Sequence, residues 1–350
     1  MKIIGIEEKE EWNRFIKSFA KWDIYYLQEY AKSLELHGDG EPQLICYESN
    51  HCKVGYVMML NDIALFPAFA GCLEKGIYYD FTTPYGYGGP LVEGDFGDSE
   101  KKQFLKELYT YCKNKGIVSQ FFRFHPLLGN QNAMEGIADV VTMKQTVYID
   151  TTDKDTIFRN MTPNCRNMIR KAEKNGIKIV ADHGEGLDDF LKIYEVTMKK
   201  NQAEDYYYFN REYFEYLIEH MTDNMIFFYA QYEGKTISAS IFFYNEWYMH
   251  YHLSGTLPEY NKLGATNLLL GKAADFAAER GITYFHLGGG VSNTDSLLSF
   301  KKHFNRNGLI DFYIGRNIFD EERFDELVAK RKELDACFDL DRKFLIKYRM

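Results

Sequence analysis

The chain has 350 residues, of which 45% are hydrophobic and 27% charged, and its formal net charge is −9 at pH 7. This length allows two domains, and the composition is typical of a globular protein. The negative charge argues against a protein that coats nucleic acid and against a DNA partner. No apolar run reaches the roughly 18 residues of an integral membrane span.

The N-terminal residues turn acidic after six positions and lack the apolar core of a signal peptide, so we expect a cytoplasmic protein. The six cysteines form no CxxC pair and lie at no metal-ligand spacing beside a histidine, and no HExxH motif occurs. We therefore predict no metal.

Two segments have the pattern of a β-hairpin. Residues 42–60 predict two strands joined by a polar turn, and residues 225–245 predict the same arrangement with Glu233–Gly234 at the turn. Each hairpin is followed along the chain by a helix, a glycine stop and a strand, at residues 104–126 and 268–290. The repeated order indicates an internal duplication.

A fresh strand after a polar loop near residue 145 predicts the domain boundary. We expect an N-terminal domain over residues 1–144 and a C-terminal domain over residues 145–350, with a helix-rich insertion at residues 153–222. Residues 321–338 predict a last amphipathic helix. The expected fold class is α/β in the α+β sense, with a mixed central sheet flanked by helices in each domain.

A basic helix is predicted between Thr162, a natural N-cap, and Gly176, a helix stop, with Pro163 in its first turn. Arg166 and Arg170 lie four residues apart and share one face. Guanidinium groups suit the geometry of phosphate oxygens, so this face is a candidate substrate-binding surface. The alternative is a solvated helix with a basic side.

Residues 78–91 combine glycine, proline and tyrosine in one turn-rich stretch. Glycines allow a ligand to approach the backbone, and tyrosines offer a flat ring with a polar end, so Tyr85, Tyr87 and Gly88 are candidate substrate-binding residues. Asp80 lies in the same stretch and is a candidate general base. The alternative is a tightly turned loop whose tyrosines fill its own hollow.

Residues 286–305 predict a strand, a glycine turn and an amphipathic helix, which is a frequent position for a site in an α/β protein. Since successive helical residues are about 100° apart, one of Lys301 and Lys302 should face solvent and the other should not. A lysine ammonium can stabilise the oxyanion of a tetrahedral intermediate. The turn adds candidate backbone N–H donors from three glycines, Gly288, Gly289 and Gly290.

Residues 257–281 predict a loop and a helix that Gly264 opens, and the N–H groups at such a helix start can bind an anion. This order resembles the acyl-CoA-binding segment of GNAT-type N-acyltransferases, whose loop reads Arg/Gln-x-x-Gly-x-Gly/Ala. Residues 261–266 keep the central glycine and lack both flanking members.

Three segments, "CRNMIRKAEKNGIKI", "PYGYGGPL" and "HLGGG…DSLLSFKKHF", in this chain resemble the Fem-type aminoacyltransferases over nearly the whole length. The resemblance implies two GNAT-like domains in tandem. It also implies transfer of an amino acid from aminoacyl-tRNA, without a cofactor, to an amine of a nucleotide-linked peptidoglycan precursor. The family's Phe-Lys pair falls on Phe300 and Lys301, which assigns charge stabilisation to Lys301. The arginines at 166 and 170 would then face the precursor's phosphates.

No Ser-His-Asp or Cys-His signature occurs, so we expect direct transfer without a covalent enzyme intermediate. The candidate bases are Asp80 and His252, the latter because a histidine pKa near neutrality suits the task and because it shares a strand face with His250.

Two other hypotheses stay open. An acyl-CoA-dependent N-acyltransferase of polysaccharide synthesis would modify an amino sugar or sugar nucleotide, and a degenerate GNAT pair would bind without catalysis. The incomplete loop at residues 261–266 favours a tRNA donor, whereas the acidic charge is awkward for tRNA and favours CoA.

Overall fold

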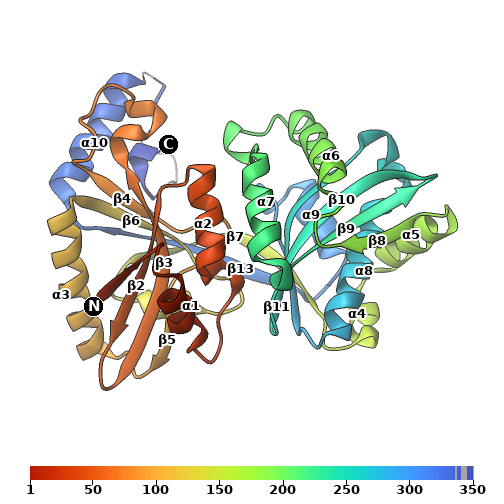
Figure 1. Cartoon of the computed structure of the whole chain (residues 1–350), viewed down its shortest axis with the longest axis horizontal. Helices are drawn as coiled ribbons and strands as arrows, with labels where there is room; N and C mark the ends of the chain where they lie inside the picture. The colour runs from red at the N-terminus through yellow and green to blue at the C-terminus, as the bar shows by residue number, and fades with distance from the viewer. Residues whose placement is uncertain (336, 340–344, 350) are drawn as a thin grey trace. The chain divides into compact units, whose positions relative to one another are not determined.

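The computed structural model describes residues 1–335, 337–339 and 345–349, and the chain forms two compact units. Unit 1 contains residues 1–143 and 312–350, and unit 2 contains residues 144–311 (Figure 1). We had expected residues 312–350 in the C-terminal domain. They belong to unit 1 because β13 (Leu309–Ile318) pairs there with β6 (Ile117–Arg123) from Ile314 onward.

The sheet of unit 1 has the strand order β1-β2-β3-β4-β6-β13, with β5 paired to β3. Only the β4–β6 pair is parallel. The remaining strands are β1 (Lys2–Gly5), β2 (Glu41–Glu48), β3 (Cys52–Asp62), β4 (Tyr79–Thr82) and β5 (Leu91–Gly94). The hairpin predicted at residues 42–60 is therefore confirmed as β2–β3.

Helices cover both faces of this sheet. The successive residues Gly55 and Tyr56 of β3 point to opposite faces. A side chain at Gly55 would meet Phe15 of α1, whereas the ring of Tyr56 lies 6.3 Å from that of Phe104 of α3. The helices of unit 1 are α1 (Lys9–Lys17), α2 (Gln28–His37), α3 (Asp98–Lys115) and α10 (Glu321–Leu334) (Figure 1).

The sheet of unit 2 has the order β7-β12-β11-β10-β9-β8, and here the parallel pair is β11–β12. The strands are β7 (Asp139–Asp150), whose first residues lie in unit 1, β8 (Lys178–Asp182), β9 (Met225–Tyr232), β10 (Lys235–Tyr244), β11 (Tyr248–Thr256) and β12 (Tyr284–Gly289). The predicted hairpin turn is confirmed, since Glu233 and Gly234 both have positive φ, as a two-residue hairpin requires.

Unit 2 also has helices on both faces of its sheet. Phe227 of β9 contacts Phe190 of α6 at 5.6 Å, and its neighbour Phe228 contacts Phe276 of α8 at the same centroid distance. The helices are α4 (Lys154–Asn160), α5 (Pro163–Lys174), α6 (Leu187–Lys200), α7 (Arg211–His220), α8 (Ala265–Glu279) and α9 (Ser296–Lys302) (Figure 1). No described helix is both long and apolar enough to cross a membrane.

The units repeat one plan: a strand, two helices, an antiparallel hairpin, another strand, a helix, and a strand parallel to the previous one. The order from the hairpin onward was predicted from the sequence. The insertion expected at residues 153–222 is only partly helical. β8 lies within it and pairs with β9, so α6 and α7 belong to the repeat and α4 and α5 precede it. This strand is short and half-exposed at the sheet edge, and it has little of the pattern that identifies a strand.

Local signals place the other helices. The Thr162 hydroxyl accepts the N–H of Cys165 at 3.2 Å and starts α5, and Gly176 follows its end with a φ of +80°. The last helix was expected over residues 321–338 and ends at Leu334, and residue 336 lies outside the described residues.

A buried ion pair ties the C-terminal segment to the sheet of unit 1. Asp80, 1% exposed, accepts two bonds from the Arg349 guanidinium, one of them from Nε at 2.7 Å. The Tyr348 hydroxyl donates to the same carboxylate at 3.0 Å. Breaking one partner of such a pair leaves an uncompensated charge, which costs several kcal/mol.

We expect Asp80→Asn to lower the free energy of unfolding by about 3 kcal/mol, and Asp80→Asn with Arg349→Met to lower it by clearly less. Urea unfolding monitored by circular dichroism measures both. Glu279→Gln is the control, because its partner Lys154 is 56% exposed and a surface pair is worth about 0.5 kcal/mol. Equal losses in the single and double variants would contradict a pairwise role.

Candidate active site

In unit 2 two neighbouring parallel strands separate. β11 and β12 pair through Tyr248 to His250 and Tyr284 to His286, and their register ends there. Beyond His286, β12 shifts its register against β7, and Gly288 adopts a φ of +75°. The C-terminal halves of β11 and β12 therefore form a fork.

The Lys301 amine lies in this fork. Lys301 is 7% exposed; its Nζ donates to the Gly289 carbonyl of β12 at 2.8 Å and lies 5.7 Å from the ring centroid of Tyr251 on β11. The neighbouring Lys302 is exposed, so the expected division of the two lysines is confirmed. The helix that carries them begins at Asp295, whose carboxylate accepts the Leu298 N–H at 2.7 Å.

A second lysine and one carboxylate tune the Lys301 amine. Burial above all, together with the nearby Lys144, lowers the pKa of Lys301 to about 7, and Asp295 partly opposes the shift. Lys144 Nζ donates to the Gly290 carbonyl at 2.6 Å. Near neutral pH the Lys301 amine can therefore both accept and donate a proton.

Two glycines of the turn act as hydrogen-bond acceptors and not as the donors that we expected. We predicted N–H donors, but Gly289 and Gly290 present carbonyl oxygens to the two lysines, and Gly288 and Gly289 pair with β7. A side chain at Gly290 would lie 2.1 Å from an oxygen of Asp295, so this position requires glycine.

Phe300, the other half of the Phe-Lys pair, packs against the core of unit 2. Its ring lies 5.4 Å from that of Phe304, and it joins the core of unit 2 from its edge. The Phe300 side chain therefore helps to pack α9 against the core of unit 2.

The structure does not support the near-neutral pKa expected of His252. Burial, followed by the neighbouring His250, lowers the pKa of His252 to about 3, which makes the ring a weak base at neutral pH. Its Nε2 lies 2.9 Å from the Tyr213 hydroxyl, and its ring packs 4.3 Å from Phe243.

The two arginines of α5 differ in what holds them. Arg166 Nη1 donates to the carbonyls of Phe158 and Met161 at 3.0 and 2.6 Å, and its guanidinium lies 4.8 Å from the Phe158 ring. Arg170 is exposed and makes one long bond, of 3.3 Å, to Asn167. Of the two, Arg170 has more donors available for a phosphate.

Gly264 starts α8, as predicted, with a φ of +78°. A side chain here would lie 2.8 Å from the Met168 carbonyl of α5. Lys171 of the same helix donates to the Lys262 carbonyl at 2.8 Å. Helix α5 thus packs directly against the loop that would hold a pyrophosphate in a CoA-binding protein.

In unit 1 the corresponding parallel strands stay joined. The β4–β6 pairing continues past Thr82 through bonds from Thr83 to Phe121 and from Gly88 to Arg123. A side chain at Gly88 would lie 2.6 Å from that of Thr83. Residues 83–88 thus fill the position in unit 1 that corresponds to the fork between β11 and β12 in unit 2.

Tyr85 and Tyr87 of the same stretch are half-buried, and both have contacts within unit 1. The Tyr87 ring lies 5.7 Å from Tyr25, burial raises its pKa to about 12, and the Tyr85 carbonyl accepts the Tyr30 hydroxyl at 2.6 Å. These contacts fit the alternative of a loop that fills its own hollow. Asp80 is committed to the ion pair with Arg349, so a role as general base is not supported.

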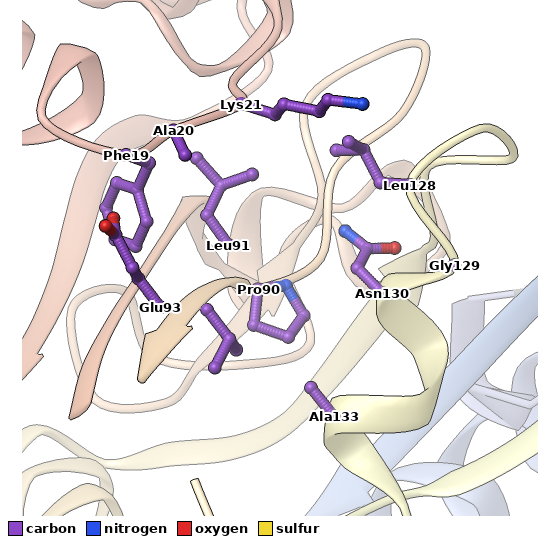
Figure 2. A pocket seen from close by; sticks show the side chains of 11 residues that line it. Phe19, Ala20, Lys21, Pro90, Leu91, Glu93, Leu128, Gly129, Asn130 and Ala133 are labelled. Carbon is purple, nitrogen blue, oxygen red and sulfur yellow. The ribbon is translucent and has the colours of Figure 1, made fainter. Parts of the chain in front are cut away.

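Unit 1 also contains a cavity of about 430 Å³, which Figure 2 shows between the segments at residues 90–93 and 128–133. Its walls are mostly apolar, and the Asn130 amide at its edge already donates to Tyr26 and Gly88. Glu93 pairs with Lys53 at 3.2 Å. The lysine that lines this cavity, Lys21, is exposed, in contrast to the buried Lys301.

Sequence reasoning missed Lys144 and Tyr251. Neither belongs to a motif. Lys144 acts on Lys301 electrostatically from β7, and Tyr251 faces it from β11, and both strands are far from α9 along the chain. The only available signal was the position of Lys144 at the predicted start of the second domain.

Residues 159–302 match the family model described as an acetyltransferase (GNAT) domain. The match lies within unit 2 and ends one residue beyond Lys301. No curated protein sequence matches the chain significantly.

Solved structures extend this likeness to both units. FemX is 12% identical with a TM-score of 0.67, covering 93% of this chain and 99% of its own. The C-terminal domain of a putative lysylphosphatidylglycerol synthetase from Agrobacterium fabrum is 11% identical with a TM-score of 0.57, covering 95% of each chain. A tandem GNAT protein from the clavulanic acid biosynthesis pathway is 7% identical with a TM-score of 0.53, covering 92% and 99%. The predicted tandem GNAT fold is confirmed.

The lowered pKa of Lys301 predicts a pH-dependent stability. Below about pH 7 the buried ammonium destabilises the folded state fully, and this penalty falls as the pH rises toward 10.5, where the unfolded lysine also loses its proton. Lys301→Met should therefore raise the free energy of unfolding by roughly 2–3 kcal/mol more at about pH 6 than at about pH 9. Urea unfolding at both pH values, with Lys302→Met as control, measures the difference, and a pH-independent effect would contradict it.

Proposed function

We propose that this protein is an aminoacyltransferase that forms an amide bond. It would move an aminoacyl group from aminoacyl-tRNA to an amine of a nucleotide-linked peptidoglycan or other cell-envelope precursor, in the cytoplasm. The observation that carries the proposal is the buried Lys301 amine in the fork between β11 and β12.

The fork supplies what amide formation requires. Backbone groups beyond His250 and His286 are released from pairing with each other and can align an ester against an incoming amine. As the amine attacks, negative charge develops on the carbonyl oxygen, and a lysine ammonium in a site of low dielectric stabilises it. The acyl group passes directly to the acceptor, without a covalent enzyme intermediate.

Unit 2 is the reactive unit in this proposal. The equivalent position of unit 1 is closed by the segment from Thr83 to Gly88, and its carboxylate, Asp80, is engaged by Arg349. Unit 1 would then contribute binding of the acceptor.

Two observations support tRNA as the donor. The loop at residues 261–266 lacks the flanking residues of a CoA-binding loop, and α5 packs against it through Met168 and Lys171. The likeness to FemX over 93% of the chain agrees with the Fem-type sequence segments.

A second candidate is an acyl-CoA-dependent N-acyltransferase acting on an amino sugar or sugar nucleotide. The description of the matched domain as an acetyltransferase and the net charge of −9 favour it.

Mass spectrometry can distinguish the aminoacyltransferase from the acyl-CoA-dependent N-acyltransferase. A UDP-linked muropeptide precursor is incubated with the protein and either charged total tRNA or acetyl-CoA, and its mass is then measured. We expect an amino-acid mass to be added with tRNA only, and an acetyl mass with CoA would establish the second candidate. Lys301→Ala should lower the rate of addition by at least about 100-fold, whereas Lys302→Ala should leave this rate unchanged. A folded and active Lys301→Ala would refute the catalytic assignment.

Arg170→Gln is expected to raise the KM for the phosphate-bearing substrate about tenfold with little change in kcat, because it removes a charge-assisted contact made equally in the ground and transition states. Initial rates over a range of acceptor concentrations measure this. Lys178→Gln removes a charge from the nearby exposed start of β8 and serves as the matched control. A similar rise in KM for both variants would indicate a general electrostatic effect.

A further inference from the structure

Two lysines hold two successive carbonyls of the turn after β12. Lys301 Nζ donates to Gly289 O at 2.8 Å, and Lys144 Nζ donates to Gly290 O at 2.6 Å. Lys301 reaches the turn from α9, and Lys144 reaches it from β7. The two amines therefore bond to the carbonyls of successive residues, although they lie near opposite ends of the sequence of unit 2.

The charged and titratable groups around Lys301 offset the effect of Lys144 only in part. The nearest carboxylate is Asp295, and its two oxygens accept the N–H groups of Leu298 and Ser292 at 2.7 and 2.8 Å. Tyr251 faces Lys301 from β11, and burial raises its pKa, so it stays neutral at physiological pH. In the described chain Lys301 forms no ion pair with a carboxylate.

Of two amines in such proximity, the more buried one bears the larger desolvation cost when charged. Lys301 is 7% exposed, whereas Lys144 is only half-buried. A proton on Lys144 therefore disfavours a second proton on Lys301.

We propose that Lys144 is a positioning residue whose charge keeps Lys301 as a neutral amine, so that Lys301 serves as the general base of the transfer. The role of Lys301 as a base rests on the proposed function. The effect of the Lys144 charge on Lys301 rests only on the geometry of the two lysines. It gives the base role to a residue other than Asp80 or His252.

The proton balance of the step is complete. The acceptor ammonium gives one proton to the Lys301 amine, which becomes an ammonium, and the freed acceptor amine attacks the ester carbonyl. The new C–N bond forms and the oxyanion is stabilised by the Lys301 ammonium. The nitrogen of the tetrahedral intermediate gives its second ammonium proton to solvent. When the C–O bond to the donor breaks, the leaving oxygen takes the proton from Lys301, which returns to the neutral amine, so that one proton is released for each amide bond formed.

The test needs no substrate. Trace acetylation with acetic anhydride over a range of pH, followed by chymotryptic digestion and mass spectrometry, reports the fraction of neutral Lys301, with exposed Lys302 as the reference for overall reactivity. The variants are Lys144→Gln, which keeps a donor for the Gly290 carbonyl and loses the charge, and Lys144→Arg, which keeps both.

We expect the midpoint of Lys301 labelling to rise by about one pH unit in Lys144→Gln and to stay unchanged in Lys144→Arg. A purely structural role of Lys144 would leave the two variants alike, and identical midpoints in them would overturn the proposal. Because labelling is measured without donor or acceptor, this outcome is independent of whether the proposed substrates are correct.

Once a transfer assay is established, the acidic limb of the kcat/KM profile should shift upward in Lys144→Gln by the same amount as the labelling midpoint. A labelling shift without a shift in the pH–rate profile would show that Lys144 tunes Lys301 but that Lys301 is not the base.

Discussion

The hydrogen bond from Lys301 to the Gly289 carbonyl is the interaction on which the candidate site depends. A lysine amine can be buried only where a polar group receives it, and the end of β12 supplies that group because its pairing with β11 stops at His286. The register shift against β7 turns the strand, and Asp295 starts α9 so that Lys301 faces inward. The absence of a side chain at Gly290 leaves room for Asp295. All of these features help to position the Lys301 amine.

The internal duplication shows how one topology serves two purposes. Both units contain a parallel pair of strands in a mixed sheet. In unit 2 the pair diverges and encloses a lysine, whereas in unit 1 the segment from Thr83 to Gly88 bonds to β6 and closes the corresponding place. Unit 1 uses its buried carboxylate, Asp80, to anchor Arg349. A buried ion pair in one unit and a buried amine in the other thus arise from the same arrangement of strands.

Much of this was accessible from the sequence, because its signals are local. The turn at Glu233, the capping of α5 by Thr162 and the contrast between Lys301 and its neighbour follow from turn chemistry, capping and helical periodicity. The return of residues 312–350 to unit 1, the ion pair of Asp80 and the contact of Lys144 with the turn involve residues far apart in the sequence. No spacing rule encodes such pairs. Edge strand β8 escaped prediction because it is short and half-exposed.

Burial explains why the candidate base is a lysine and not a histidine. Desolvation disfavours the charged form of any base, so it lowers the pKa of both residue types. For His252 the shift ends at about 3, which is too low for proton transfer near neutrality, whereas for Lys301 it ends at about 7, where the amine exchanges protons readily. In a buried site, a base whose unperturbed pKa is high is therefore left closer to neutrality than one whose unperturbed pKa is moderate. The neighbouring ammonium of Lys144 acts in the same direction as burial and helps to bring Lys301 into that range.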